Sequence, residues 1–313
     1  MTPPNGLAAK PSRVFPWIML VGGAIAYSSA FSANRFAFDA GFPFLAYSFW
    51  QALFAAAGLL IVSALLRSLP QVSAAHLKLY ALTAIVGFGI PLLALTFAAG
   101  KLPPAVLPLV VTLVPALTYV FALVLRVERF QILSIAGLLL GLAGVVLIIV
   151  LPAGSLGTGV AAGWLILALV APLGYALNNV AVSFLRPAAT NSLQLSTGVL
   201  AVGAIVLLPV TLIVDGPVMF TSIPAMGIVA TFWAAAANVV IFLCLFEIIR
   251  LAGPVFFSQF NYVVVAAGIL WGVVFFPQDA AFSPWVWGAV AIMAAGLVLA
   301  NTGTNKAIGE SEE

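Results

Sequence analysis

The chain alternates long apolar runs with short polar segments from about residue 15 to residue 300. Each run is about 20 residues long, which at 1.5 Å rise per residue spans a hydrocarbon core of about 30 Å. An outer-membrane barrel would instead show short segments of alternating polarity. The pattern therefore predicts an all-α integral membrane protein. We expect ten transmembrane helices, spans one to ten, at about 15–34, 43–66, 79–99, 103–125, 131–150, 160–184, 191–213, 224–248, 254–276 and 283–300.

The sequence also repeats. The stretch KLPPAVLPLVVTLVPALTYVFALVLRVERF, which begins at Lys101, returns about 150 residues later as LAGPVFFSQFNYVVVAAGILWGVVFFPQDA from Leu251, with Pro104 over Pro254. Each copy starts the fourth span of a set of five. Because five is odd, the second set enters the membrane upside down, which predicts two inverted-topology five-helix repeats. The expected boundaries are a tail at 1–14, a first repeat at 15–151, a linker at 152–159, a second repeat at 160–300 and a tail at 301–313.

Composition and charge agree with a membrane protein and indicate its orientation. Hydrophobic residues make up 64% of the chain and charged residues 6%, far from the balance of a soluble domain. With the N-terminus in the cytoplasm, Arg35 and Lys101 are outside and the other nine of the eleven Lys and Arg residues are inside. We expect a multi-pass membrane protein with both termini cytoplasmic. Eleven scattered basic residues form no stripe for nucleic acid.

The sequence offers little reactive chemistry. Its single cysteine, Cys244, lies in an apolar run, and its single histidine, His76, is expected in a solvated loop. No catalytic triad or metal site can be assembled from these residues, so we expect no enzyme, metal or cofactor. No charged side chain falls in the middle third of a span, and Glu247 comes closest. Three residues before Arg250, it fits a helix-end ion pair, and the alternative is a proton-coupling carboxylate that faces a cavity.

Neutral polar and aromatic residues are instead dense within the spans. In span six, Trp164, Tyr175 and Asn178 are spaced so that they can share one helix face. Two interpretations stay open, because amides also join helices and aromatic side chains also form belts at membrane interfaces. The candidate substrate-binding residues are Tyr27, Tyr47, Trp50, Gln51, Trp164, Tyr175, Asn178, Asn179, Asn238, Gln259, Asn261 and Tyr262.

Glycine marks spans five and ten, at Gly137, Gly141, Gly144, Gly288 and Gly296. Small residues let helices approach closely, so we expect these spans to form a scaffold outside the transport path. They would also supply the contact if the protein is a weak homodimer and not a monomer. The other expected partners are a small-molecule substrate and membrane lipid.

Two inverted sets of five spans, with Pro115 in span four and the turn Val127-Glu128-Arg129-Phe130 at its exit, resemble the drug/metabolite transporter superfamily. The chain is most similar to the EamA-type permeases and, among them, to bacterial aromatic amino acid exporters, which implies a location in the bacterial inner (plasma) membrane. The resemblance implies a cavity built from spans one to four and six to nine. Gln278 and Val265 replace the Glu and the Pro of the second half, which favours a structural role for Glu128. It also predicts that span four bends and span nine stays unbroken.

Two functions follow from this resemblance. In the first, the protein exports amino acids, both aromatic ones and other neutral or zwitterionic metabolites, by alternating access of its two halves. The alternative is a proton-coupled exporter of cationic drugs or other small metabolites. By family resemblance the alternative requires a Glu in span one, where this chain has Tyr27, Ser28, Ser29 and Ser32. We therefore favour the first function.

Overall fold

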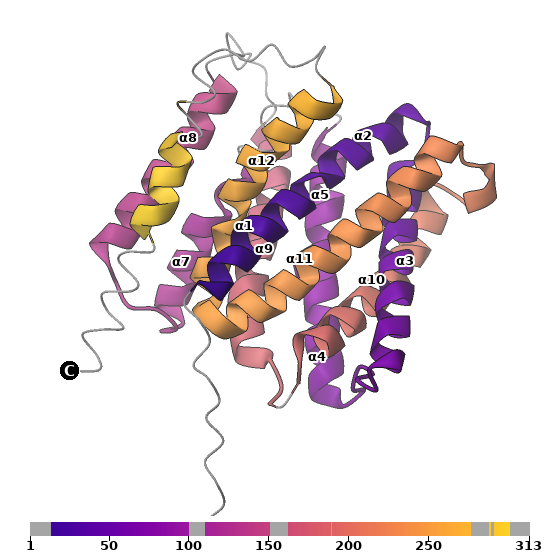
Figure 1. Ribbon diagram of the computed structural model, residues 1–313, viewed down its shortest axis with the longest axis horizontal. Helices are drawn as coiled ribbons and strands as arrows, with labels where there is room; N and C mark the ends of the chain where they lie inside the picture. Colours follow the sequence, from indigo (N-terminus) through magenta and orange to yellow (C-terminus); the bar gives the residue numbers. More distant parts are fainter. Residues whose placement is uncertain are drawn as a thin grey trace, which may run out of the picture.

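The computed structural model describes residues 14–99, 110–150, 162–188, 190–276, 288 and 291–300. Within these ranges the chain is helical and contains no strand (Figure 1). Six helices in this part of the chain have the length and apolar composition needed to cross a membrane. The all-helical membrane architecture is therefore confirmed, while the count of ten spans and their inversion stay predictions. The linker at 152–159, Gln278, residues 1–13 and the tail at 301–313 lie outside the described residues.

The first three predicted spans are helical but not uniform. Span one consists of α1 (Phe15–Ser28) and α2 (Ala30–Asp39), and span two is α3 (Phe44–Leu65). Span three begins earlier than expected, with α4 (Ala74–Ala84), and continues through the π-helix η1 (Ile85–Gly89) into α5 (Ile90–Ala99). A π-helical turn widens the backbone ladder locally and is frequent at functional sites.

The remaining elements follow the apolar runs closely. They are α7 (Val114–Val124), α8 (Ile132–Val150), α9 (Ala162–Leu185), α10 (Ser192–Val214), the 3₁₀ turn η2 (Phe220–Ser222), α11 (Ala225–Ser258), α12 (Phe260–Phe275) and a final helix at Ala291–Ala300. Within α11, Gly253 has φ 85° and ψ 169°, which is not helical. Spans eight and nine therefore meet at a sharp turn with no loop between them.

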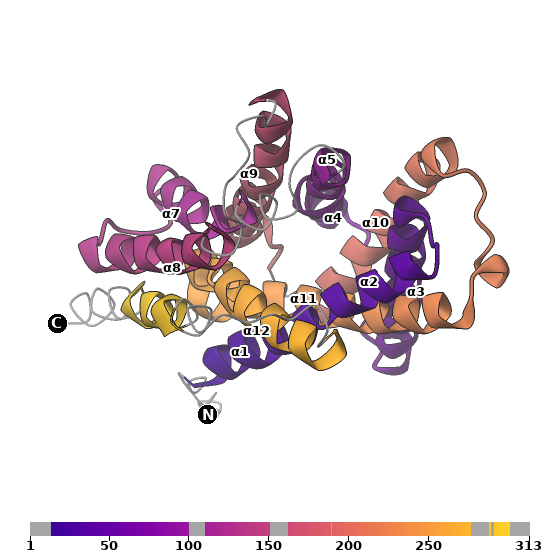
Figure 2. The same cartoon turned by 90° about the horizontal axis from the view of Figure 1, so that it is seen from above.

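The core lies between the two halves of the chain. Helices α3 and α10 pack together, α5 and α7 pack on α9, and α1 packs on α11 and α12 (Figure 2). The largest apolar cluster accordingly joins Leu20 and Tyr80 of the first half to Leu200, Phe246 and Phe260 of the second. Any movement of one half against the other would act on this contact.

Helix α8 and the helix at Ala291–Ala300 lie side by side at one end of the molecule (Figure 1). A Cβ on Gly137 would clash with the backbone of Ala300, and a Cβ on Gly296 would clash with the backbone of Gly141. Glycine therefore permits a backbone-to-backbone contact within the chain, as expected for a scaffold. The predicted homodimer through the same spans remains untested.

The expectation that span nine is unbroken is wrong. Span four is interrupted at Thr112 and Leu113, so that Pro115 lies in the first turn of α7. Span nine is interrupted as well, at Gln259 between α11 and α12. There the Nδ2 of Asn261 donates to the carbonyl of Ser258 at 3.0 Å, which offers that carbonyl a partner outside the regular helix ladder.

Candidate functional site

Several predicted site residues form polar contacts between helices. Across the interface of the halves, the Nδ2 of Asn238 in α11 donates to the Oε1 of Gln51 in α3 at 2.8 Å. The hydroxyl of Tyr47 is buried and donates to the Oδ1 of Asn34 at 2.9 Å. The indole of Trp50 donates to the carbonyl of Val218 at 3.3 Å. These residues connect α2 and α3 with α11 and the segment that precedes it.

Two neighbouring amides of α9 face different partners. The Nδ2 of Asn179 donates to the Oγ1 of Thr118 in α7 at 3.4 Å. Asn178 is 4% exposed, and within the described part of the chain its Oδ1 is a buried acceptor with no hydrogen-bond partner. A Cβ placed on Gly87 in η1 would lie 2.5 Å from the Cγ of Asn178, so the amide packs directly on the π-helix. An orphaned buried acceptor is costly in free energy, which makes this contact a candidate functional point.

Aromatic residues of α1 and α12 lie close to one another. The ring centroid of Tyr27 is 6.2 Å from that of Phe260. Tyr175 in α9 is half-buried. Trp164, at the other end of α9, packs on a separate small cluster with Ala98 and Val110. The shared face expected for α9 therefore meets different neighbours along its length.

The predicted residues of span nine are also divided. Gln259 is fully buried at the interruption, and Asn261 bonds to the backbone beside it. The hydroxyl of Tyr262 donates to the carbonyl of Leu138 in α8 at 2.9 Å, and a Cβ on Gly141 would touch its ring. Tyr262 thus faces the scaffold helix α8. None of the twelve predicted residues lines either of the two cavities described, which lie beside Arg186 and between α8 and the last helix.

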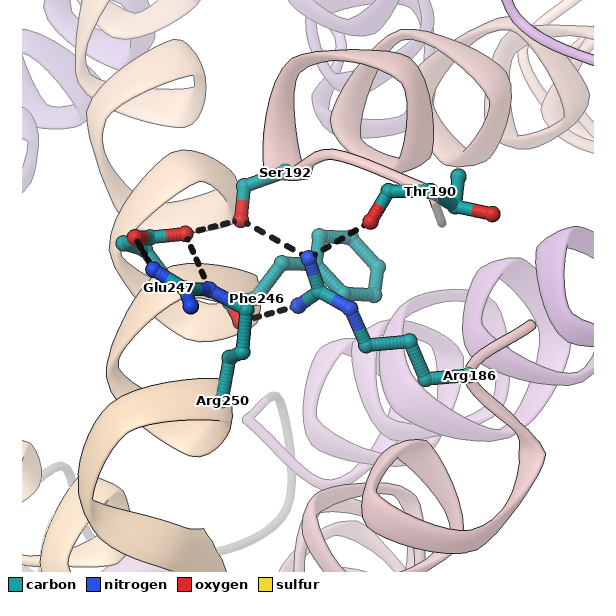
Figure 3. Close-up of polar contacts among 6 residues, drawn as sticks. All are labelled: Arg186, Thr190, Ser192, Phe246, Glu247 and Arg250. Atoms are coloured by element: carbon teal, nitrogen blue, oxygen red, sulfur yellow. Dashed lines mark hydrogen bonds and ion pairs between the residues drawn. The ribbon is translucent and has the colours of Figure 1, made fainter. Parts of the chain in front are cut away.

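A charged cluster lies where the C-terminal end of α9 and the start of α10 meet the part of α11 that precedes Gly253, and the sequence predicts only part of it (Figure 3). The ion pair expected between Glu247 and Arg250 is present. In addition, the hydroxyl of Ser192 donates to the Oε2 of Glu247 at 2.5 Å, and the guanidinium of Arg186 donates to the carbonyl of Phe246 at 2.6 Å. The pair is three residues apart and readable from sequence, whereas the contacts of Arg186 depend on how helices pack.

The chain from Arg186 to Ser192, here called the α9–α10 loop, is held from both halves. Asn191 caps α10 in a capping box with Gln194, and its Nδ2 donates to the Oγ of Ser68 at 2.7 Å. The Nε2 of His76 is 2.8 Å from the Oγ1 of Thr190. The expectation of a solvated His76 is therefore wrong. The residue lies in α4 and is 4% exposed, because Ser73 and Thr190 satisfy both ring nitrogens.

Glu128, which lies between α7 and α8, meets the turn at Gly253. A Cβ on Gly253 would lie 3.5 Å from the Oε1 of Glu128. The carboxyl is half-buried, and burial raises its pKa above the usual range of glutamate. Thus the exit of span four contacts the junction of spans eight and nine.

Several long apolar helices that pack through neutral amides and aromatic rings are typical of a polytopic membrane protein. Residues 15–150 match the EamA-like transporter family. The match confirms the resemblance of this part of the chain to the EamA-type permeases and indicates a membrane transporter of small metabolites, while the similarity to amino acid exporters stays a prediction.

Comparison with curated protein sequences gave no match. Several solved structures are similar to the chain. One of them, described only as the crystal structure of a protein, has a TM-score of 0.72 and 21% sequence identity, and the match covers 92% of this chain and 97% of that one. At this identity the similarity concerns the fold alone.

Proposed function

We propose that the protein exports amino acids, aromatic ones and other neutral or zwitterionic metabolites, across the bacterial inner membrane by alternating access. The family of residues 15–150 supports transport. The packing of the two halves against each other supports rocking of one half on the other as the movement.

The observation that carries the choice of substrate is the buried Oδ1 of Asn178, which no described group satisfies. An amide oxygen accepts hydrogen bonds, and the ammonium group of an amino acid donates three. In the closed contact with Gly87 there is no room for a ligand, so separation of α9 from η1 would open the site. The rings of Tyr27 and Tyr175 would then stack on an aromatic side chain of the substrate.

The paired amides Gln51 and Asn238 fit the same proposal. Each is satisfied by the other in this conformation, at 2.8 Å. When the halves separate, the hydrogen bond between the two amides breaks. The carboxylate and ammonium groups of a zwitterion can then bond to the amides in its place. Neutral amides can bind such a substrate without a buried charged side chain.

The test is uptake of labelled phenylalanine into proteoliposomes. We expect Asn178→Ala to lower kcat/KM by about 10-fold or more, the cost of a lost hydrogen bond, and Tyr175→Leu to lower it because the ring that stacks on the substrate is lost. Tyr262→Phe is the matched control, because its hydroxyl bonds to α8, and it should transport like the wild type. No uptake of any amino acid, together with drug-stimulated proton flux, would refute the proposal.

One observation favours the second candidate, proton-coupled export of cationic compounds. Glu128 is a half-buried carboxyl at the contact of the halves, and within the described residues it has no hydrogen-bond or ion-pair partner. Such a group can bind and release protons as its burial changes. Proton flux that a cationic drug stimulates in the wild type and not in Glu128→Gln would support this candidate.

A further inference from the structure

Within the described residues, the hydrogen bonds of the Arg186 guanidinium all go to neutral groups. Its Nη1 donates to the carbonyl of Phe246 at 2.6 Å, and its Nη2 donates to the carbonyl of Thr190 at 2.9 Å and to the Oγ of Ser192 at 3.3 Å (Figure 3). The nearby carboxylate of Glu247 is engaged by Arg250 and Ser192. Two guanidinium groups therefore share one carboxylate, and the cluster keeps an excess charge of 2 − 1 = +1 among the described residues.

This excess charge borders a cavity. The cavity has a volume of about 460 Å³ and lies between the C-terminal end of α9 and the part of α11 that precedes Gly253. Arg186, Arg250 and Thr190 give it a polar side, and Val182 and Ile249 give it an apolar wall. Half-burial lowers the pKa of Arg186 below its usual range, since the charged form loses hydration there. A bound anion would offset that loss, and arginine binds carboxylates with two parallel hydrogen bonds.

We propose that this cavity binds the carboxylate of the transported substrate, and that it is the point where the substrate enters from the face that carries Arg186. The identity of the substrate rests on the proposed function. The apolar wall would receive the side chain of the substrate. Its carboxylate would compete with Glu247 for the guanidinium groups and for Ser192.

The loop that lines the cavity also contacts the first half. Thr190 and Asn191 bond to His76 and Ser68 of the first half, and Arg186 and Ser192 bond to α11, which belongs to the second half together with the loop. An anion that draws Ser192 and Arg186 away from α11 would therefore loosen the loop within its own half and leave its bonds to His76 and Ser68 in place.

The test compares benzoate with benzamide, which share the ring and differ in the carboxylate. Both would be titrated against the purified protein in detergent, and the shift of its thermal unfolding would be recorded. We expect benzoate to stabilise the wild type and benzamide to have no such effect. Arg186→Gln should weaken benzoate binding by about 10-fold or more. Arg186→Lys should weaken it by less, because lysine keeps the positive charge but cannot form the two parallel hydrogen bonds of a guanidinium.

Two further variants separate binding from folding. Lys78→Gln removes a positive charge from an exposed position of α4 near the same loop, and should bind benzoate like the wild type. Ser183 lines the cavity, so the larger side chain of Ser183→Trp would fill it. The serine hydroxyl donates to the carbonyl of Val180 in its own helix. Ser183→Trp should abolish benzoate binding even if Arg186→Gln does not fold.

The outcomes distinguish this inference from the proposed function. Benzoate binding that depends on Arg186, without transport of any amino acid, supports the proposed anion site and refutes the proposal that the substrate is an amino acid. Amino acid transport with equal benzoate and benzamide effects, or with unchanged benzoate binding in Arg186→Lys and Ser183→Trp, overturns the anion site. Stabilisation by phosphatidylglycerol that depends on Arg186, with no effect of benzoate, identifies a lipid phosphate as the ligand and also overturns it.

Discussion

The Oε1 of Glu128 lies against Gly253, at 3.5 Å from the position that a Cβ on this glycine would take. Glu128 ends span four of the first half, and Gly253 joins spans eight and nine of the second. The φ of 85° and ψ of 169° at Gly253 belong to a backbone region that only glycine occupies readily. A carboxyl group of the first half therefore contacts a turn of the second half whose backbone conformation requires glycine.

Gly253→Ala should destabilise the protein by about 1–3 kcal/mol, because a Cβ is strained at these dihedral angles. Thermal unfolding in detergent is the measurement. Gly58→Ala is the matched control, since a Cβ there meets open space within the helix α3. It should leave the stability unchanged or raise it by up to about 1 kcal/mol. Equal effects of the two substitutions would contradict the assigned backbone strain.

Glu128 should make stability depend on pH. Its pKa is raised in the folded state, so folding favours the protonated form. This contribution is fully present below the ordinary glutamate pKa of about 4.3, and it is lost as the pH rises through the folded-state pKa. In Glu128→Gln the side chain is neutral throughout. The unfolding temperature of the wild type should therefore fall relative to that of Glu128→Gln as the pH rises. A difference that stays constant with pH would show that folding does not raise the pKa of Glu128.

The bond between Asn238 and Gln51 should show as a coupling energy in a double-mutant cycle. Asn238→Leu and Gln51→Leu each leave a polar group without its partner. The double variant removes both groups, and we expect a coupling of about 0.5–2 kcal/mol, the range found for hydrogen bonds between membrane helices. Transport kinetics of the same variants decide their role. Loss of transport in the double variant with stability preserved indicates substrate binding, and retained transport indicates helix joining.

The face that carries Gln71 should be cytoplasmic, and the face that carries Ser222 should be external. Cys244 is buried and is the single cysteine, so an introduced cysteine supplies the accessible thiol. Both positions are exposed in the structure. On intact cells, a membrane-impermeant maleimide should label Ser222→Cys and should label Gln71→Cys only after permeabilisation. The reverse pattern would show the opposite orientation.

The helices were largely readable from the sequence, because a run of about 20 apolar residues has few alternatives in a membrane. The ion pair of Glu247 and Arg250 was readable for a related reason, since partners three residues apart on a helix meet regardless of the fold. The interruption of span nine at Gln259 was missed. There the side chain of Asn261 bonds to the carbonyl of Ser258, and no proline lies at the interruption.

The sequence by itself determined that the protein lies in a lipid membrane, where its helices run and which neutral polar residues they contain. Only the tertiary structure decided which of those groups meet: Asn238 with Gln51, Asn178 with the π-helix, and His76 with Thr190. The physical reason is that lipid is as apolar as the helix interfaces. An apolar position that faces lipid and one that faces another helix look alike in the sequence, so the pattern marks where a helix runs and not which neighbour it faces.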